Sequence, residues 1–229
     1  MRLMFLWQFL MAKKSSLDTG PVIVFGMHRA GTSLVANILD KVGVSMGDKF
    51  LSPDGLNPNG YYEDEDFLWI NKGILEHAGG VWYSPPSVEN IKETGVKFRE
   101  AIHTTVEKKK AKAGKNLWGW KDPRMCLTCW TYGIDIAYAR HIVVVRNLRD
   151  IKKSLNKAHG YLADWDSVID AYYTSVEHFL GARTNLAMNI SFEELIYPEY
   201  ALQAVQKLLD FVDKPRNLEQ KALRAINFR

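Results

Sequence analysis

The sequence has few cysteines and no concentration of histidines. Its two cysteines, Cys126 and Cys129, are separated by two residues, and no second pair follows. A structural zinc site usually needs four cysteine or histidine ligands, and a disulfide-stapled fold needs several pairs, so the sequence favours neither. The six histidines are scattered, without a His-Glu-x-x-His motif. We therefore expect no metal. The cysteines are typical of buried helix packing in a reducing compartment, with a redox role as the alternative.

Long apolar runs are absent as well. The apolar stretch at residues 3–11 is too short to span a bilayer, and lysines follow it instead of a small-residue cleavage site. We expect a cytoplasmic protein without stable membrane insertion. Residues 1–20 are predicted to form an N-terminal extension. Met11 offers a second plausible start, so residues 1–10 are either an artefact of the assigned start or a packed or swapped arm.

A strong net charge of either sign is also missing. The formal charge of +4 fits an anionic ligand but is too weak to indicate a nucleic-acid-binding surface. Hydrophobic residues make up 47% of the chain and aromatic residues 12%, which is enough for a core and argues against disorder. A chain of 229 residues fits one domain, which we place at residues 21–229.

Strand and helix patterns alternate along the chain. The clearest strand is 141–145, a β-branched run of the kind that a parallel sheet buries on both faces. The alternation predicts a single α/β domain with a central, mostly parallel sheet flanked by helices, and a ligand site at the carboxyl ends of the strands. Strands are expected at 21–26, 117–120, 141–145 and 186–190, and helices at 31–42, 63–76, 89–112, 148–158, 164–183, 199–212 and 216–226.

The turn between the first strand and the first helix carries the most information. Gly26 and Gly31 allow close approach of the backbone, Arg29 adds a positive charge, and Thr32 and Ser33 add donors. A helix that begins after such a turn presents unpaired N–H groups and a partial positive charge, an arrangement that binds phosphate. The turn is not a Walker A loop, because no lysine follows its last glycine. An ordinary βα turn is the alternative.

Cations follow two further strands. Lys121 and Arg124 come directly after the strand at 117–120, and Arg146 closes the strand at 141–145. Because the carboxyl ends of parallel strands meet at one edge of a sheet, we expect these side chains and Arg29 to surround one crevice. Arg149, one turn further along, is expected to point toward solvent.

These segments resemble the sulfotransferases that use 3′-phosphoadenosine 5′-phosphosulfate (PAPS). Residues 26–33, Gly-Met-His-Arg-Ala-Gly-Thr-Ser, resemble that family's 5′-phosphosulfate loop. Residues 146–154 begin with an arginine and end with a serine, like its 3′-phosphate motif. Residues 57–63 and 118–124 resemble segments of the bacterial and Golgi-type branch. The resemblance runs from about residue 22 to 195. Two positions depart from it: Ala30 replaces the usual serine, and Leu148 replaces a common proline.

The resemblance implies a P-loop-like architecture and a set of site residues. It implies that Glu63 takes the proton of the acceptor, unless this residue is an acidic helix start, and that Lys121 stabilises the sulfo oxygens, unless it pairs with Asp122. Arg29 has the same stabilising role, and no metal is required. The residues implied to contact the co-substrate are His28, Arg29, Ala30, Gly31, Thr32 and Ser33 at the phosphosulfate, and Arg146 and Ser154 at the 3′-phosphate.

The implied reaction moves the sulfo group of PAPS to a hydroxyl or amine and leaves 3′-phosphoadenosine 5′-phosphate (PAP). The sequence does not specify the acceptor, for which a carbohydrate, a lipid or a small metabolite is expected. Residues 191–195 are interpreted as structural. A P-loop-like kinase or NTPase and a non-catalytic nucleotide-binding protein are the alternatives. Four aromatic residues either line an acceptor pocket or cover the core: Tyr61, Trp82, Tyr83 and Trp165.

Overall fold

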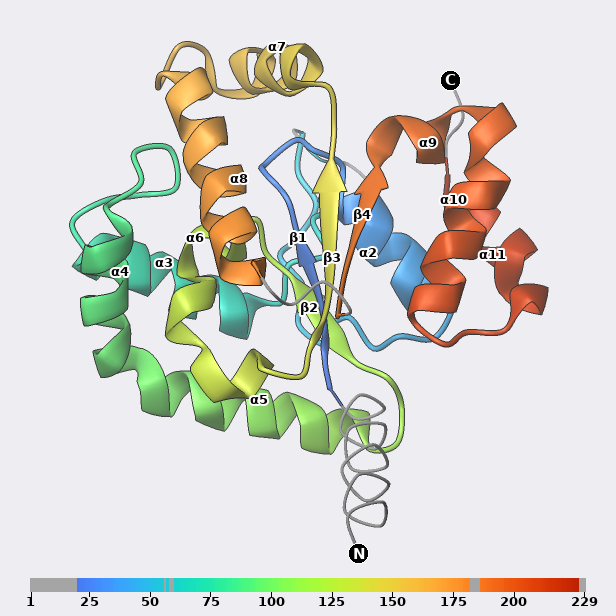
Figure 1. The fold of residues 1–229 in the computed structure, drawn as a ribbon, viewed down its shortest axis with the longest axis horizontal. Coiled ribbons are helices and arrows are strands. Elements are labelled where there is room, and N and C mark those ends of the chain that lie inside the picture. Colours follow the sequence, from blue (N-terminus) through green and yellow to red (C-terminus); the bar gives the residue numbers. More distant parts are fainter. Residues whose placement is uncertain (1–19, 56, 58–59, 182–185, 227–229) are drawn as a thin grey trace, which may run out of the picture.

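Four parallel strands form the centre of the molecule (Figure 1). All three neighbouring pairs are parallel, with Val24 opposite Lys121 in one pair and opposite Ile142 in another. The predicted parallel α/β sheet is thus confirmed. The strands are β1 (Val22–Phe25), β2 (Gly119–Lys121), β3 (Arg140–Val145) and β4 (Ala187–Ser191), in the spatial order β2-β1-β3-β4.

The computed structural model describes residues 20–55, 57, 60–181 and 186–226. The N-terminal extension predicted for residues 1–20 therefore lies, apart from Gly20, outside the described residues.

The side chains of the central strands alternate between two hydrophobic clusters. In β1, Val22 and Val24 belong to the cluster on one face of the sheet, whereas Ile23 and Phe25 belong to the cluster on the other. In β3 the same alternation puts Val143 and Val144 on opposite faces of the sheet. Apolar burial on both faces is the strongest favourable contribution to such a sheet. It explains why these two strands read as continuous apolar runs in the sequence.

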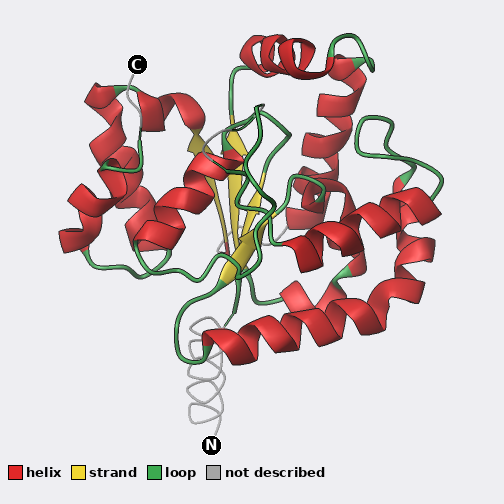
Figure 2. Cartoon of the chain, turned by 180° about the vertical axis from the view of Figure 1, so that it is seen from behind, coloured by secondary structure: helices red, strands yellow, loops and turns green. Residues whose placement is uncertain are grey.

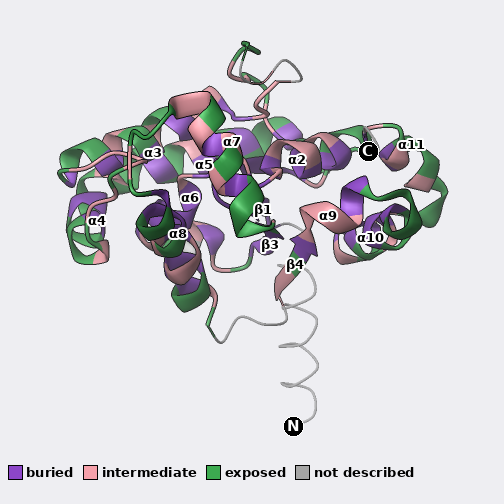
Figure 3. Cartoon of the chain, turned by 90° about the horizontal axis from the view of Figure 1, so that it is seen from above, coloured by how far each residue is buried: buried purple, intermediate pink, exposed green. Residues whose placement is uncertain are grey.

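Helices cover both faces of the sheet, as the view from behind shows (Figure 2). Their buried residues lie on the sides turned toward the sheet (Figure 3). One cluster is completed by α2 (Thr32–Lys41), α9 (Phe192–Ile196), α10 (Pro198–Phe211) and α11 (Glu219–Leu223). The other is completed by α3 (Glu65–His77), α4 (Val88–Gly95), α5 (Arg99–Ala113), α6 (Met125–Thr128), α7 (Leu148–His159) and α8 (Trp165–Leu180).

Several predicted helix boundaries were wrong. The single helix expected at 89–112 is two helices, because α4 ends at Gly95 and a 3₁₀ turn, η1 (Val96–Phe98), precedes α5. Gly95 packs so closely on Thr131 that a Cβ atom there would lie 2.3 Å from Cγ2 of that threonine. The chain then turns, and α5 buries Ile102 and Val106 along a different line. A straight helix cannot make both contacts.

Smaller differences concern the short elements. The helix predicted at 216–226 is a 3₁₀ turn, η5 (Arg216–Leu218), followed by α11. The helix predicted at 164–183 ends at Leu180, and residues 182–183 lie outside the described residues. Neither α6 nor α9 was predicted, and each has at most five residues, too few for a periodic pattern. Two further 3₁₀ turns are η2 (Cys129–Thr131) and η3 (Gly133–Ile136).

Cys126 and Cys129 are buried, on α6 and at the start of η2. Burial raises the pKa of the Cys126 thiol to about 12. The prediction of buried helix packing is confirmed.

Within the described ranges, the helices are too short or too polar for any of them to cross a membrane.

Candidate active site

The turn after β1 is shaped by two glycines. Gly26 has φ 147° and donates its N–H to Cys126 Sγ at 3.2 Å. A Cβ at Gly26 would lie 2.8 Å from the carbonyl oxygen of Val144, so a side chain would displace β3. Gly31 caps α2 with φ 98° and makes no side-chain cap hydrogen bond. Leu34 N–H donates to the Gly31 carbonyl at 3.0 Å, and among the described residues the N–H groups of Thr32 and Ser33 are left for an external acceptor.

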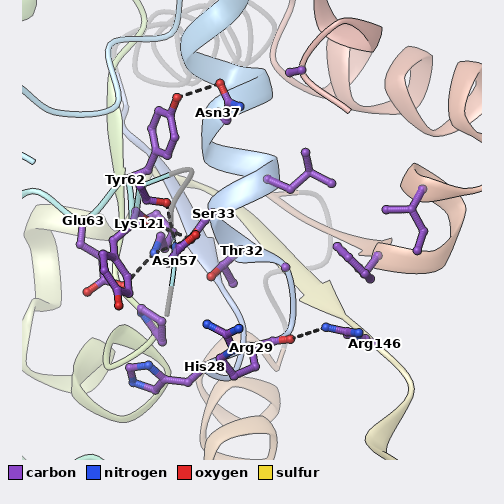
Figure 4. A pocket seen from close by; sticks show the side chains of 18 of the residues that line it. His28, Arg29, Thr32, Ser33, Asn37, Asn57, Tyr62, Glu63, Lys121 and Arg146 are labelled. Carbon is purple, nitrogen blue, oxygen red and sulfur yellow. Dashed lines mark hydrogen bonds and ion pairs between the residues drawn. The ribbon is translucent and has the colours of Figure 1, made fainter. Parts of the chain in front are cut away.

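A cavity of about 610 Å³ opens beside this turn, at the carboxyl ends of the strands (Figure 4). Among the residues that the structure describes, its lining contains five cations and one carboxylate. Ala30 does not line it, because the residue is fully buried in the turn, and Ser154 lies behind Arg29. The predicted site residues that do line the cavity are His28, Arg29, Gly31, Thr32, Ser33, Glu63, Lys121 and Arg146.

Arg29 joins the two predicted phosphate motifs directly. Its Nε donates a hydrogen bond to Ser154 Oγ on α7 at 2.9 Å. Its carbonyl oxygen accepts a hydrogen bond from a terminal nitrogen of Arg146 at 2.9 Å, at the end of β3. Arg29 itself has φ 68°, a left-handed conformation that is uncommon for a residue with a side chain. The two motifs thus form one wall of a single cavity.

Phe192, at the start of α9, packs between these motifs. The Arg146 guanidinium lies over its ring, 4.5 Å from the centroid. A Cβ at Gly31 would lie 2.2 Å from the same ring. The segment 191–195, interpreted from the sequence as structural, therefore also contributes to the cavity wall.

Glu63 and Lys121 form a buried ion pair at the opposite wall. Their side chains are joined at 2.8 Å, and Arg124 approaches the other carboxylate oxygen at 3.3 Å. Burial raises the pKa of Glu63, but the positive charges of Lys121 and Arg124 outweigh it and hold that pKa below its ordinary value. Lys121 Nζ also donates to Ser33 Oγ at 3.3 Å, which links this wall to the start of α2.

Two alternatives raised by the sequence are wrong. Glu63 does not cap a helix, because Asp64 is the N-cap of α3 and accepts a hydrogen bond from the N–H of Asp66. Lys121 pairs with Glu63, whereas the carboxylate of Asp122 pairs with Arg124 at 2.7 Å and accepts a hydrogen bond from Asn71. Burial raises the pKa of Asp122.

Three acidic residues gather beside the site around one lysine. Lys109 Nζ contacts the carboxylates of Asp48, Asp64 at 2.6 Å and Asp66 at 2.9 Å. Hydrogen bonds from Lys109 hold the pKa values of Asp48 and Asp66 below their ordinary range. This cluster fixes the start of α3, directly after Glu63.

The four aromatic residues predicted to line an acceptor pocket or to cover the core lie in three different places. Tyr61 lines the cavity, and its hydroxyl donates to Asp54 at 2.7 Å. Trp82 and Trp165 stack on each other at 5.8 Å. Tyr83 lines a second cavity of about 780 Å³ between the 83–89 segment and α8.

Sequence reasoning missed several lining residues. Arg224 and Lys41 add two cations at the far end of the cavity, where α11 packs beside α2, and nothing near either residue in the sequence suggests this. Asn57 belongs to a segment that the resemblance did include. Its amide donates to the carbonyl of Gly60 at 2.8 Å and shapes that loop.

No protein-family model matches the sequence, and no curated protein matches it either. The fold is similar to two solved structures. Sulfotransferase STF9 from Mycobacterium avium matches over 89% of this chain and 66% of its own, with a TM-score of 0.54 and 12% identity. Sulfotransferase STF1 from Mycobacterium tuberculosis H37Rv matches over 90% and 70%, with a TM-score of 0.49 and 12% identity. The present chain spans just under two thirds of the STF9 chain, and the two share a fold.

Proposed function

We propose that this protein is a sulfotransferase that uses PAPS and transfers its sulfo group to a hydroxyl or amine of a carbohydrate, a lipid or a small metabolite. The observation that carries the proposal is the contact of Arg29 with both Arg146 and Ser154, which brings two phosphate motifs to one cavity. The fold shared with STF9 agrees with it.

The charge of the cavity fits an anionic nucleotide. The five lining cations are Arg29, Lys41, Lys121, Arg146 and Arg224, whereas the lone carboxylate, Glu63, is already ion-paired. A ligand with several phosphate charges compensates such an excess, because charge-assisted hydrogen bonds are about twice as strong as neutral ones. Apolar side chains of Leu34, Phe192 and Ile196 line the region beyond the turn, a surface suited to a planar base.

The residues divide into two ends of one binding site. At the sulfur end, Arg29, the backbone N–H groups of Thr32 and Ser33, and Lys121 would hold the phosphosulfate. At the ribose end, Arg146 would hold the 3′-phosphate, with Ser154 keeping Arg29 in place. When bound, PAPS supplies an activated sulfo group whose bond to the 5′-phosphate breaks during transfer. Arg29 and Lys121 stabilise the negative charge at this end of the cavity.

The acceptor must lose a proton as the reaction proceeds. Glu63 and His28 are among the titratable groups that line the cavity near the turn, together with Lys121 and Tyr61. Glu63 is the residue that the sequence predicts for this role.

Thermal unfolding with added nucleotides tests the proposal. PAP is expected to raise the melting temperature strongly without magnesium, since anion binding here relies on side-chain cations. A larger shift from ATP that requires magnesium would favour a kinase or NTPase and contradict the proposal. Equal shifts, or no shift with either nucleotide, would favour a non-catalytic protein.

A further inference from the structure

We propose that His28 is the group that takes the proton from the acceptor, and that Glu63 acts as a positioning residue for Lys121 and Arg124. This inference rests on the proposed function and assigns one role within it. It changes the role that the sequence resemblance gives to Glu63.

The position of His28 supports this role. The residue precedes Arg29 in the glycine turn and lines the same cavity (Figure 4). Consecutive Cα atoms lie about 3.8 Å apart, so His28 is held at the sulfur end by the chain itself. Trp82 packs on the imidazole with ring centroids 4.4 Å apart, and Tyr172 meets it edge-on at 6.0 Å. These contacts fix the ring without using a ring nitrogen.

One ring nitrogen of His28, the buried Nε2, has no hydrogen-bond partner in the part of the chain that the structure describes. A buried polar atom without a partner is costly, and such atoms are rare unless a ligand completes them. An acceptor hydroxyl is a partner of the required kind, because a neutral imidazole has one nitrogen that accepts a hydrogen bond.

Glu63, in contrast, is fully engaged. Its Oε1 accepts a hydrogen bond from Lys121 at 2.8 Å, and its Oε2 accepts one from Arg124 at 3.3 Å. Both carboxylate oxygens are therefore occupied by cations, whereas Nε2 of His28 has no partner among the described residues.

The surroundings of His28 keep its ring neutral while no ligand is bound. Burial lowers the pKa of His28 well below its ordinary value, and the charges of Arg124, Lys121, His159 and Arg29 lower it further. A bound nucleotide brings negative charge to the same cations. The pKa of His28 is therefore expected to rise when nucleotide binds, so that binding takes up protons.

The proton transfer that follows is simple. The acceptor O–H bond breaks, its proton passes to a ring nitrogen of His28, and the electron pair stays on the acceptor oxygen, which bonds to sulfur. The electron pair of the breaking sulfur–oxygen bond stays on the 5′-phosphate. The imidazolium that forms returns its proton to solvent after the products leave.

Calorimetry of PAP binding tests the inference without turnover. Titrations in two buffers of different ionisation enthalpy, at a pH between about 5 and 7 where histidine titrates, count the protons taken up. The wild-type protein is expected to take up more protons than H28N and H28Q, by up to about one proton. H159N is the matched control, since His159 also faces Arg29 and its pKa is lowered by burial. Equal uptake by wild type and both His28 variants would overturn the inference.

Chemical rescue provides the second test, with PAPS and water as the probe and PAP release as the signal. H28A is expected to lower this rate by about a hundredfold or more, and added imidazole to restore part of it. Rescue of E63A by formate, with H28A active as wild type, would overturn the inference and leave the proposed function intact. Failure of the wild type to bind PAP would overturn both.

Discussion

Arg29 Nε and Ser154 Oγ lie 2.9 Å apart, although 125 positions separate the two residues in the sequence. The bond ties the glycine turn after β1 to α7. A second hydrogen bond connects the same turn to the end of β3, because Arg146 donates to the Arg29 carbonyl oxygen at 2.9 Å. A ligand that touches Arg29 therefore contacts a side chain whose position depends on α7 and β3.

Removing the hydroxyl in S154A is expected to weaken PAP binding by about tenfold, because a hydrogen bond to a charged group contributes about 1.5–3 kcal/mol. The fold is expected to stay intact, since Ser154 is half-buried. Titration calorimetry measures the affinity. S45A, at an exposed serine that does not line the cavity, is the control. Unchanged affinity in S154A would show that Arg29 needs no anchor.

The buried Glu63 ion pairs predict a pH-dependent stability. E63Q is expected to lower the free energy of unfolding by about 3 kcal/mol at neutral pH, because the buried Lys121 loses its carboxylate partner and Arg124 keeps only Asp122. The folded-state pKa of Glu63 is lowered, so its contribution is present above about pH 4.5 and is lost as pH falls through that lowered value. Urea unfolding at several pH values measures this. E65Q, at a carboxylate paired with the exposed Lys49, is expected to cost less than about 1 kcal/mol.

Lys109 holds three carboxylates, and K109M is expected to destabilise the protein by about 3 kcal/mol at neutral pH. Because Lys109 lowers the pKa values of Asp48 and Asp66, the effect is expected to shrink as pH falls below about 4 and these groups protonate. Urea unfolding compares the variant with K115M, at an exposed lysine. An equal loss at neutral and acidic pH would assign the effect to packing instead of charge.

The cysteines are expected to be unreactive in the folded protein. Cys126 and Cys129 are buried, and a pKa of about 12 leaves almost no Cys126 thiolate at neutral pH. Neither thiol is expected to react with Ellman's reagent until guanidinium chloride unfolds the chain, when both react. Rapid labelling of native protein would contradict the burial of this pair.

Much of the fold follows from local patterns. The β-branched runs of β1 and β3 are buried on both faces, so they stand out in the sequence as short apolar segments. The cations at the carboxyl ends of three strands were predictable too, because parallel strands end at one edge. This is why Arg29, Lys121 and Arg146 were expected together before any coordinates.

The remaining features depend on contacts between distant segments. Gly95, the last residue of α4, packs on Thr131. Helix propensities describe neighbours in the sequence and therefore cannot predict this contact. Arg224 reaches the cavity because α11 packs beside α2. The pairing of Lys121 with Asp122, raised as an alternative because the two are adjacent in the sequence, does not form: Lys121 pairs with Glu63, which comes from another loop.

The cavity wall includes residues from both ends of the described chain, from His28 to Ala225. Residues 28 to 225 must therefore all be synthesised before this pocket is complete. A ligand of this cavity has no complete pocket on a nascent chain that ends before residue 225, so it is expected to stabilise only the folded domain.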